Sequence, residues 1–474
     1  MSLLEDLRNK YPEYDDLSDG ELAEKYAKKH PNMKQALKEH LLSEKTICVV
    51  DSGYFISLAR KLSGSFKKVY YCTPTDKEFL SINDYAMGTG FPEIEKIEGY
   101  GFMEPEILKE IDCFCFSDIG YVPIQEYLRS IGKPIWGSFG ATDLEIFRTK
   151  FLESIAKLGM PVAPYKKIKG TTKLIEHLKT VKRKWIKVDR FRKEMETWFH
   201  IDYPHSEPEL TRLCLVFGGM REEIDFIVQD EIKSNIETGG DLWTIDGKYP
   251  SKYFYGFEDK NELYIASLLD ADKMPKSVIE INEKLIPLFK EYGFRGEFAT
   301  EIREVGSKYF FIDPTFRFPG MSGEHQLETC ANLAYIIYYG AQGKYIEPAW
   351  DYNFAVVASA YYCGANEDGW SVVKVPKEIE RWVKFSHCCM IDGYYKFPSE
   401  EAKDLGVVIG AGKTLIDAFK MLQKNIEALK EEPVYFKTKG FLKLLNSIRE
   451  AEKKGNKFSN DKLPDDEEIL KYIE

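Results

Sequence analysis

Short apolar runs alternate with amphipathic stretches over the early part of the chain, and this alternation predicts its architecture. Apolar runs predict strands at residues 46–52, 68–73, 113–117 and 134–137, and amphipathic stretches predict helices at residues 54–62 and 124–131. Strands that alternate with helices in this way form a parallel sheet with helices on both faces. The pattern therefore predicts a doubly wound α/β subdomain.

The turn after the first strand tests one function of such a sheet. Asp51-Ser52-Gly53 follows that strand and contains a single glycine. A dinucleotide-binding turn needs the spacing G-x-G-x-x-G, because its glycines let the backbone approach the pyrophosphate. The sequence therefore argues against an NAD site at this turn.

The middle of the chain predicts a β-hairpin with one carboxylate on each strand. Glu301 and Asp313 lie in alternating apolar runs on either side of a Gly306-Ser307 turn. Period-two alternation places Phe311 and Asp313 on one face of the second strand. Asp313 is then expected to meet Glu301 across the strand pair.

Adjacent carboxylates at Glu301 and Asp313 repel each other unless a cation lies between them. A hard ion that prefers oxygen ligands, such as Mg²⁺, fills this role and generally brings nucleotide phosphates with it. Arg317, just beyond Asp313, adds a planar set of donors suited to phosphate or carboxylate. An ordinary surface hairpin with solvated acids is the alternative, so the neighbouring segments decide between the two.

Basic side chains stand at particular places in two predicted elements before the hairpin. Arg148 begins an amphipathic stretch that Gly159 and Pro161 end, which predicts a helix that leads into a strand. Lys187 lies late in the apolar strand 184–188, where a lysine is costly to bury unless it meets an anion. The position of Lys187 therefore favours an anionic ligand over a solvated edge residue, whereas the helix of Arg148 is by itself typical of a packing helix.

The remaining elements follow the same rules. The apolar run 226–232 predicts a strand with Asp230 near its end and Glu237 in the connection beyond it. After the hairpin, the pattern predicts helices at residues 327–339 and 414–429 and strands at residues 355–362 and 405–412. Gly410-Ala411-Gly412 lacks the Gly-Lys-Ser/Thr that completes a phosphate loop, so we expect a packing turn there.

Four of these features occur in the order typical of the ATP-grasp superfamily, which the sequence resembles from about residue 45 to about residue 430. They are Arg148 with its helix, the strand with Lys187, the segment from Asp230 to Glu237, and the hairpin from Glu301 to Arg317. The family's second hairpin strand usually has the pattern Glu-x-Asn-x-Arg. Here Asp313 and Thr315 stand at the positions of Glu and Asn, and both remain oxygen ligands.

The resemblance implies an ATP site with Mg²⁺, for which Mn²⁺ is an alternative ion. We call residues 229–237 the hinge, where the family's main-chain groups contact adenine. The resemblance implies that Arg148 and Lys187 contact the phosphates, and that Arg190 and Arg192 replace the amides of the family's flap. Gln229, Asp230 and Glu231 would form the adenine side of the hinge, and Glu237 would bind the ribose hydroxyls. Glu301, Asp313 and Thr315 would bind the metal, and Arg317 would bind the acyl phosphate.

The resemblance also implies a reaction and a layout. In the family, a substrate carboxylate attacks the γ-phosphate of ATP, and an amine captures the resulting acyl phosphate to form an amide. The layout is similar to that of phosphoribosylamine–glycine ligases. It implies a pre-ATP-grasp Rossmann-like subdomain at residues 44–140, an ATP-grasp domain at 141–345 (small lobe at about 165–228, metal-binding lobe at about 229–345) and a small C-terminal α+β domain at 346–432. Outside the resemblance, we expect a charged helical appendage at residues 1–43 and a solvated helical tail at residues 433–474. The expected fold class is α/β, with two α+β ATP-grasp lobes.

Departures from the family leave two classes of function open. Arg148 replaces the usual lysine, Thr315 replaces asparagine, and residues 189–197 replace a glycine-rich flap. Arg317-Phe318-Pro319-Gly320-Met321 replaces the Arg-Phe-Gly-Asp-Pro-Glu signature of phosphoribosylamine–glycine ligases, which leaves the substrates open. The first hypothesis is a carboxylate–amine ligase with small-molecule substrates. The alternative is an ATP-binding, non-catalytic module that kept the fold and lost turnover.

Composition narrows the classes of partner. The 474 residues are 44% hydrophobic, enough for a substantial core, and carry 66 Lys plus Arg against 77 Asp plus Glu, a net charge of −11. Such an acidic chain does not bind nucleic acid broadly by charge, and the basic cluster from Lys182 to Lys193 is better explained by ATP phosphates. We expect a monomer or homodimer.

Cysteine spacing and the amino terminus bear on the compartment. The nine cysteines are scattered without C-x-x-C pairs, which favours reduced thiols in a cytoplasmic protein. No signal peptide or transmembrane helix is predicted, so we expect no membrane partner. The segment 11–23 resembles a short amino-terminal segment common in bacteriophage proteins, and this leaves phage origin as a hypothesis.

Overall fold

The computed structural model describes residues 22, 41–74, 86–190, 197–234, 237–259, 262–306, 308–365, 369–398 and 404–473. The segment 1–43, in which we expect a charged appendage, lies outside the described residues except for Leu22 and residues 41–43. The hypothesis of phage origin rests on that segment and is not addressed by the structure.

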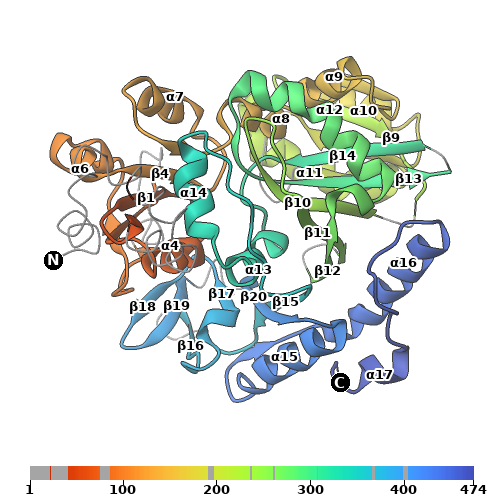
Figure 1. Ribbon diagram of the computed structural model, residues 1–474. Coiled ribbons are helices and arrows are strands. Elements are labelled where there is room, and N and C mark those ends of the chain that lie inside the picture. The colour runs from red at the N-terminus through yellow and green to blue at the C-terminus, as the bar shows by residue number, and fades with distance from the viewer. Residues whose placement is uncertain are drawn as a thin grey trace, which may run out of the picture.

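A five-stranded parallel sheet forms the N-terminal part of the structure (Figure 1), in the order β3-β2-β1-β4-β5. Its elements are β1 (Thr46–Val50), α4 (Ile56–Ser63), β2 (Lys68–Cys72), β3 (Glu95–Ile97), α6 (Pro105–Glu110), β4 (Cys113–Phe116), α7 (Val122–Ser130) and β5 (Ile135–Trp136). The predicted doubly wound subdomain is confirmed. The sequence analysis misses β3, because three residues with two charges show no apolar run. β2 and β4 flank β1, so the carboxyl ends of β1 and β4 form the crevice where such sheets bind ligands.

A four-stranded antiparallel sheet, which we call the small sheet, follows in the order β6-β9-β7-β8. Its elements, preceded by α8 (Thr142–Ile146) and α9 (Arg148–Lys157), are β6 (Tyr165–Lys169), α10 (Thr171–Leu178), β7 (Lys184–Val188), β8 (Thr197–His200), α11 (Tyr203–Phe217) and β9 (Asp225–Asp230). Leu174 of α10 and Leu213 of α11 pack with Ile186 and Phe226 in one apolar cluster. The two helices therefore cover one face of this sheet.

A nine-stranded sheet, which we call the large sheet, contains the predicted hairpin. Its main order is β14-β13-β10-β11-β12-β15-β20-β17, and β21 pairs with β15. The strands are β10 (Glu237–Ile245), β11 (Lys252–Asp259), β12 (Leu263–Asp270), β13 (Arg295–Val305), β14 (Lys308–Thr315), β15 (Phe354–Tyr362), β17 (Val383–Phe385), β20 (Asp404–Gly412) and β21 (Val434–Tyr435). Because β12 pairs with β15, hydrogen bonding continues across the predicted domain boundary at residue 345.

Helices and a small third sheet surround the large sheet. They are α12 (Lys276–Tyr292), α13 (Met321–Thr329), α14 (Leu333–Ala341), β16 (Trp370–Val373), β18 (Cys389–Ile391), β19 (Tyr394–Pro398) and α15 (Leu415–Glu427). α13 and α14 replace the single helix expected at residues 327–339, because Cys330 is extended and pairs with Trp350. Gly410, Ala411 and Gly412 end strand β20, so the turn expected there is wrong, but the packing role is confirmed, because a Cβ on Gly410 would lie 2.1 Å from the carbonyl oxygen of Ala418 on α15. Within the described ranges, no helix combines the length and the apolar character that crossing a membrane requires.

The C-terminal segment is packed against the large sheet, so the prediction of a solvated tail at residues 433–474 is wrong. α16 (Phe441–Lys453) buries Phe441, Leu444, Leu445 and Ile448, and α17 (Asp466–Leu470) follows it. These four side chains have the spacing of one helix face. The lysines at residues 453–457 suggest a solvated segment, but they lie at and beyond the end of α16, so they do not describe its buried face.

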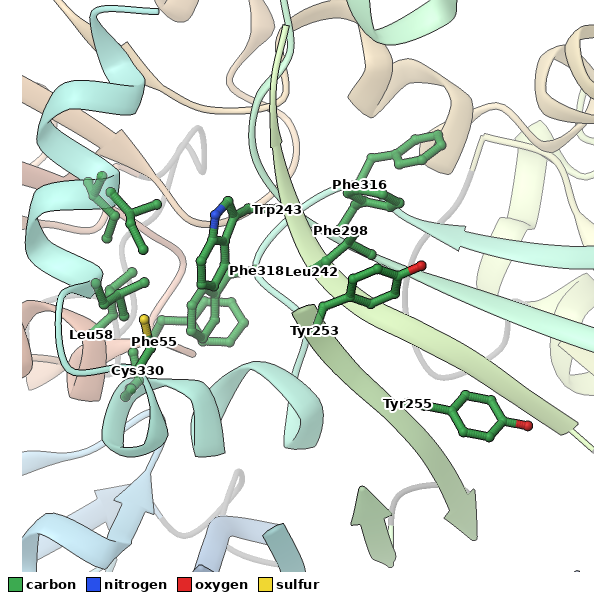
Figure 2. Close-up of a cluster of buried hydrophobic side chains, with 14 of the residues drawn as sticks. Phe55, Leu58, Leu242, Trp243, Tyr253, Tyr255, Phe298, Phe316, Phe318 and Cys330 are labelled. Carbon is green, nitrogen blue, oxygen red and sulfur yellow. The ribbon is translucent and has the colours of Figure 1, made fainter. Parts of the chain in front are cut away.

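One apolar core joins the N-terminal sheet to the large sheet (Figure 2). Phe55, which precedes α4, packs edge to face on Phe318 with the ring centres 4.9 Å apart, and Figure 2 shows both near Trp243 of β10. Phe298 and Phe316 lie together across β10 from Trp243, with ring centres 6.4 Å apart. Phe316 and Phe318 are therefore both anchored in the core, and the core fixes the residue between them.

Glu297 on β13 is a buried carboxyl within this core. Trp136 Nε1 donates a hydrogen bond of 2.6 Å to Glu297 Oε2, whereas Oε1 has no hydrogen-bond partner among the described residues. Burial raises the pKa of Glu297 from 4.5 to about 7, although the Trp136 hydrogen bond opposes the shift. A folded-state pKa above the unfolded value means that ionisation destabilises the fold. The contribution of Glu297 to stability is present below pH 4.5 and is lost as the pH rises through about 7.

We expect Glu297→Gln to raise the free energy of unfolding at pH 8 by up to about 3 kcal/mol, because glutamine keeps an acceptor for Trp136 and carries no charge. Near pH 4.5 the variant and the wild type should be equally stable. Urea unfolding at the two pH values measures both differences. Glu291→Gln, at an exposed position on α12, is the control and should change neither value. Equal effects of Glu297→Gln at both pH values would refute the titration of this carboxyl.

Candidate active site

The two hairpin carboxylates meet across neighbouring strands. Glu301 on β13 pairs directly with Asp313 on β14, in antiparallel register. The next pair is Ile302 with Phe311, so Ile312 is an extra residue in a β-bulge. The bulge changes the alternation, and the prediction that Phe311 and Asp313 share a face is therefore wrong. Phe311 lies opposite Ile302 in the core, while Asp313 remains beside Glu301.

The face that holds these carboxylates has the chemistry of a site for a hard metal ion. Thr315 follows Asp313 on the same face of β14, opposite Ala299, and it adds a hydroxyl oxygen to the two carboxylates. Oxygen donors of this kind suit Mg²⁺ or Mn²⁺. Within the described parts of the chain, no three or more His, Cys, Asp or Glu side chains group closely enough to hold a metal.

Two basic side chains from other elements reach the same hairpin. Arg148, the first residue of α9, is buried; its Nη1 donates to Thr197 Oγ1 at 2.6 Å, and its Nη2 lies 4.0 Å from Asp313 Oδ2. Lys187 Nζ, on β7, donates to the backbone carbonyl of Ile312 at 3.4 Å. The structure thus brings together Arg148, Lys187 and Asp313, which the sequence places far apart.

Asp189 fixes the start of α9, although the sequence analysis gives it no role. Its carboxylate accepts hydrogen bonds from Thr149 N at 3.1 Å and from Thr149 Oγ1 at 2.7 Å. An acid in this position satisfies a free N–H at the positive end of the helix. Because Arg148 precedes Thr149, Asp189 helps to hold Arg148 in place. The available signal was an acid directly after the strand that carries Lys187.

Two further predicted phosphate contacts lie in the segment that replaces the flap. Arg190 is exposed, has a positive φ of 70°, and its guanidinium lies 5.2 Å from the centre of the Phe147 ring. This contact places Arg190 beside the residue that precedes α9. Arg192 lies outside the described residues. The convergence described above therefore involves Arg148 and Lys187.

The first part of the hinge is held by ion pairs within the small sheet. Asp230 pairs with Lys184, and Glu231 accepts two hydrogen bonds from Arg183, at 2.8 and 2.6 Å. Gln229 is buried and lies opposite Trp185 in the β7–β9 register. The side chains of Asp230 and Glu231 are thus paired with basic side chains at the start of β7.

Glu237 begins β10 on the other side of the hinge. Arg303 Nε donates to Glu237 Oε2 at 2.8 Å, and the two residues face each other in the β10–β13 register. Glu237 is therefore a paired carboxylate, and any ribose contact involves Glu237 and Arg303 together. Arg303 lies two residues beyond Glu301, so the partner of Glu237 and one predicted metal ligand lie on the same strand, β13.

Arg317 lies at the junction of the hairpin with the N-terminal sheet. Its Nε donates to Glu145 Oε1 at 3.1 Å and lies 3.7 Å from Asp118 Oδ1. Glu145 also accepts from Phe316 N at 2.9 Å, and Phe318 N donates to the carbonyl of Ser117 at 3.1 Å. Although burial opposes it, the carboxylates of Glu145 and Asp118 raise the pKa of Arg317, which keeps the guanidinium charged.

Several solved structures have a fold similar to that of this chain. No family model matches the sequence, and no curated protein matches it. Among solved structures, phosphoribosylamine–glycine ligase from Thermotoga maritima has a TM-score of 0.58 at 14% identity, over 83% of this chain and 97% of that chain. L-amino acid ligase from Bacillus licheniformis has a TM-score of 0.54 at 12% identity, over 83% and 99% of the two chains. A biotin carboxylase complex from Campylobacter jejuni has a TM-score of 0.54 at 10% identity, over 82% and 92%.

All three of these structures are ATP-grasp ligases. The chain has the ATP-grasp fold. The expected fold class is therefore confirmed, at sequence identities too low to carry more than the fold. In this chain, Arg148 of α9 and Lys187 of β7 contact the hairpin of the large sheet, and the hinge connects the small sheet to the large sheet along the sequence.

The site also contains two buried acids, Asp51 and Glu324. Asp51, after β1, accepts from Tyr71 Oη and from Phe55 N, both at 2.7 Å, and burial followed by repulsion from Asp118 raises its pKa to about 6. Glu324, on α13, accepts from Ser57 Oγ at 2.7 Å, and burial raises its pKa to about 7. These acids lie beside the crevice at the carboxyl ends of β1 and β4. The proximity of Asp51 to Asp118 and of Glu324 to Asp51 depends on tertiary structure, which no local pattern reveals.

Proposed function

We propose that the protein is an ATP-dependent ligase that joins a small-molecule carboxylate to an amine through an acyl phosphate. The observation that carries this proposal is the convergence of Arg148 and Lys187 on the paired carboxylates Glu301 and Asp313. Cations and acids placed together suit a polyphosphate with its divalent ion, because each charge then has a partner. The ligases with similar folds support the same class of reaction.

The proposed reaction has two steps. In the first, a carboxylate oxygen of the substrate attacks the γ-phosphorus of ATP, and ADP leaves. In the second, an amine nitrogen attacks the acyl carbon, inorganic phosphate leaves and the nitrogen loses a proton. Catalysis of the first step depends mainly on positioning and on neutralising charge.

Arg148 and Lys187 hold the phosphates in this proposal. Glu301 and Asp313, with Thr315, would hold Mg²⁺ or Mn²⁺, which neutralises negative charge on the transferred phosphoryl group. Arg148 Nη2 lies 4.0 Å from Asp313 Oδ2, so a phosphate held by Arg148 would lie beside a proposed metal ligand.

The two ends of the site have different proposed tasks. At the nucleotide end, the hinge main chain contacts adenine, and Glu237 with Arg303 contacts the ribose. At the substrate end, Arg317 holds the acyl phosphate, since its guanidinium is fixed by Glu145 and Asp118 and stays charged. A fixed donor aimed at developing charge needs little reorganisation during the reaction.

A second candidate function is nucleotide binding without turnover. The observation that favours it is the contact of Arg190 with the Phe147 ring, which places a predicted phosphate ligand on an aromatic side chain. A module of this kind binds ATP through Arg148 and Lys187 and lacks the remaining phosphate contacts that transfer requires. The two candidates therefore differ in turnover and agree in binding.

The test is ATP turnover by the purified full-length protein with Mg²⁺ and a panel of carboxylic acids and amines. Hydroxylamine in place of the amine captures acyl phosphates as hydroxamates, so it detects the first step alone. We expect ADP and hydroxamate only with particular acids, and an amide only when a particular amine is added. ATP binding without ADP release for any pair would favour the non-catalytic module. Absence of ATP binding would refute both candidates.

A further inference from the structure

A cavity of about 530 Å³ opens at the hinge, and three separate parts of the chain line it. One wall is Arg183 with the hinge residues 231–234, and the second is the tip of the hairpin at residues 303–306. The third is Lys454, at the end of α16. A volume of this size suits a nucleoside or a similar small molecule. The C-terminal segment therefore contributes to a cavity whose other walls belong to the candidate nucleotide site.

The chain around Lys454 is held against the hairpin tip. The Lys454 and Gly455 amides close the last turn of α16, and Gly455 has a positive φ of 94° that suits glycine. Asn456 Nδ2 then donates to Glu304 Oε2 at 2.7 Å, and Ser277 Oγ donates to the other oxygen of Glu304 at 2.5 Å. The backbone turn therefore fixes the position of Lys454. The neighbouring Glu304 carboxylate accepts a hydrogen bond at each of its two oxygens.

Phe458 anchors the same segment in the large sheet. Its ring is fully buried, with centre distances of 5.8 Å to Phe257, 6.2 Å to Tyr255 and 6.5 Å to Phe354. Ser267 Oγ donates to the carbonyl of Phe458. We call residues 441–459, from the start of α16 to just beyond this anchor, the C-terminal element. Its buried apolar face and its buried ring make it a permanent part of the fold.

Charge in the cavity is unbalanced toward cations. Four lining side chains are basic (Arg183, Lys233, Arg303 and Lys454) and two are acidic (Glu231 and Glu304). Arg183 pairs with Glu231, and Arg303 pairs with Glu237. After these pairings, Lys233 and Lys454 stand against Glu304, which leaves an excess of one positive charge and provides two ammonium groups as donors for acceptor atoms of a ligand.

The position of the cavity along β7 indicates which part of a nucleotide it receives. Arg183, which lines the cavity, directly precedes β7, and Lys187 lies four residues further along the chain at the proposed phosphate position. Four residues of extended chain span about 13 Å, which is comparable to the length from the terminal phosphate to the base of a nucleotide. The hinge cavity therefore lies where the adenosine end of ATP would extend.

We propose that the C-terminal element is the third wall of the nucleotide site, and that Lys454 donates to acceptor atoms of the adenosine end of ATP. This inference rests on the proposed binding of ATP and adds a specificity-determining residue that lies outside the hairpin, the hinge and β7. Binding of ATP and docking of the C-terminal element are then coupled, because each stabilises the other.

The test compares Lys454→Met with Lys453→Met in the full-length protein. The two changes remove the same charge from adjacent positions, but Lys453 is 71% exposed and pairs with Glu450, away from the cavity. Calorimetry with ATP and with adenosine should show about a ten-fold loss of affinity for both ligands with Lys454→Met. Lys453→Met should stay within about two-fold, and Lys454→Arg should recover most of the loss. Unfolding in urea should be unchanged in all three variants.

A second measurement addresses the coupling directly. Amide hydrogen exchange of residues 441–459 should slow when ATP binds the wild type, and it should slow less in Lys454→Met. The inference would be overturned if Lys453→Met and Lys454→Met had the same affinity for ATP, whether or not that affinity was lower than in the wild type. In that case Lys454 would make no specific contact, and any loss would come from long-range charge alone. ATP binding that Lys187→Met weakens and Lys454→Met does not would overturn this inference and keep the proposed function. No ATP binding by the wild type would overturn both.

Discussion

Asp313→Asn should lower ATP turnover about a thousand-fold, which corresponds to about 4 kcal/mol of lost stabilisation of the transition state. Asparagine keeps the size of the side chain and removes the negative charge that lies opposite Glu301 in the strand register of the hairpin. The remaining donors hold a divalent ion less firmly, so phosphoryl transfer loses its charge neutralisation. The affinity for ATP in EDTA should stay the same or increase, because one carboxylate near the phosphates is gone.

Two measurements make this result specific. Turnover with Mg²⁺ and ATP affinity in EDTA separate loss of the ion from loss of the nucleotide. Asp272→Asn removes an exposed acid after β12 and should change neither quantity. Turnover of Asp313→Asn within about ten-fold of the wild type would exclude Asp313 from the metal site.

Lys187→Met should weaken ATP binding about a hundred-fold, or about 2.7 kcal/mol, and leave adenosine binding nearly unchanged. The physical reason is that Lys187 contacts the carbonyl of Ile312, beside Asp313, at the end of β7 that lies away from the hinge. Methionine fills similar space and has no charge, so the change removes the phosphate contact and retains the packing. Calorimetry with the two ligands measures the difference.

Lys169→Met is the matched control for this change. Lys169 is on β6 of the same sheet, is 56% exposed and pairs with Glu223 at 2.6 Å. Its loss should alter ATP affinity by less than about two-fold. If Lys187→Met weakened ATP and adenosine equally, the side chain would act on the fold of the lobe, and its assignment to phosphate would fail.

Local patterns predicted the elements that are defined by their own residues. The strands β1, β2 and β4 are short apolar runs with turn signals on both sides, so periodicity finds them. The pairing of Glu301 with Asp313 follows from a hairpin, in which the partner is close in sequence. The bulge at Ile312 was not predictable, because it depends on which side chains the core accepts.

Residues that meet only in the folded protein were missed. Asp118 and Glu145 approach Arg317 from two other parts of the chain, and neither lies in a pattern that names its partner. The docking of α16 was also missed, although its apolar face is visible in the sequence. An amphipathic helix indicates that some surface covers it, and the sequence does not say which surface.

The hydrogen bonds of residues 316–318 have a mechanical consequence. They tie the hairpin to Glu145 and Ser117, and the large sheet continues without a break from β14 to β17. The small sheet shares no strand pairing with the large sheet among the described strands. Rotation of the small sheet as a rigid body therefore moves Lys187 and leaves Glu301, Asp313 and Arg317 in their mutual geometry. Under the proposed function, such a rotation would let nucleotide enter and leave while the framework proposed for the acid and the amine stays assembled.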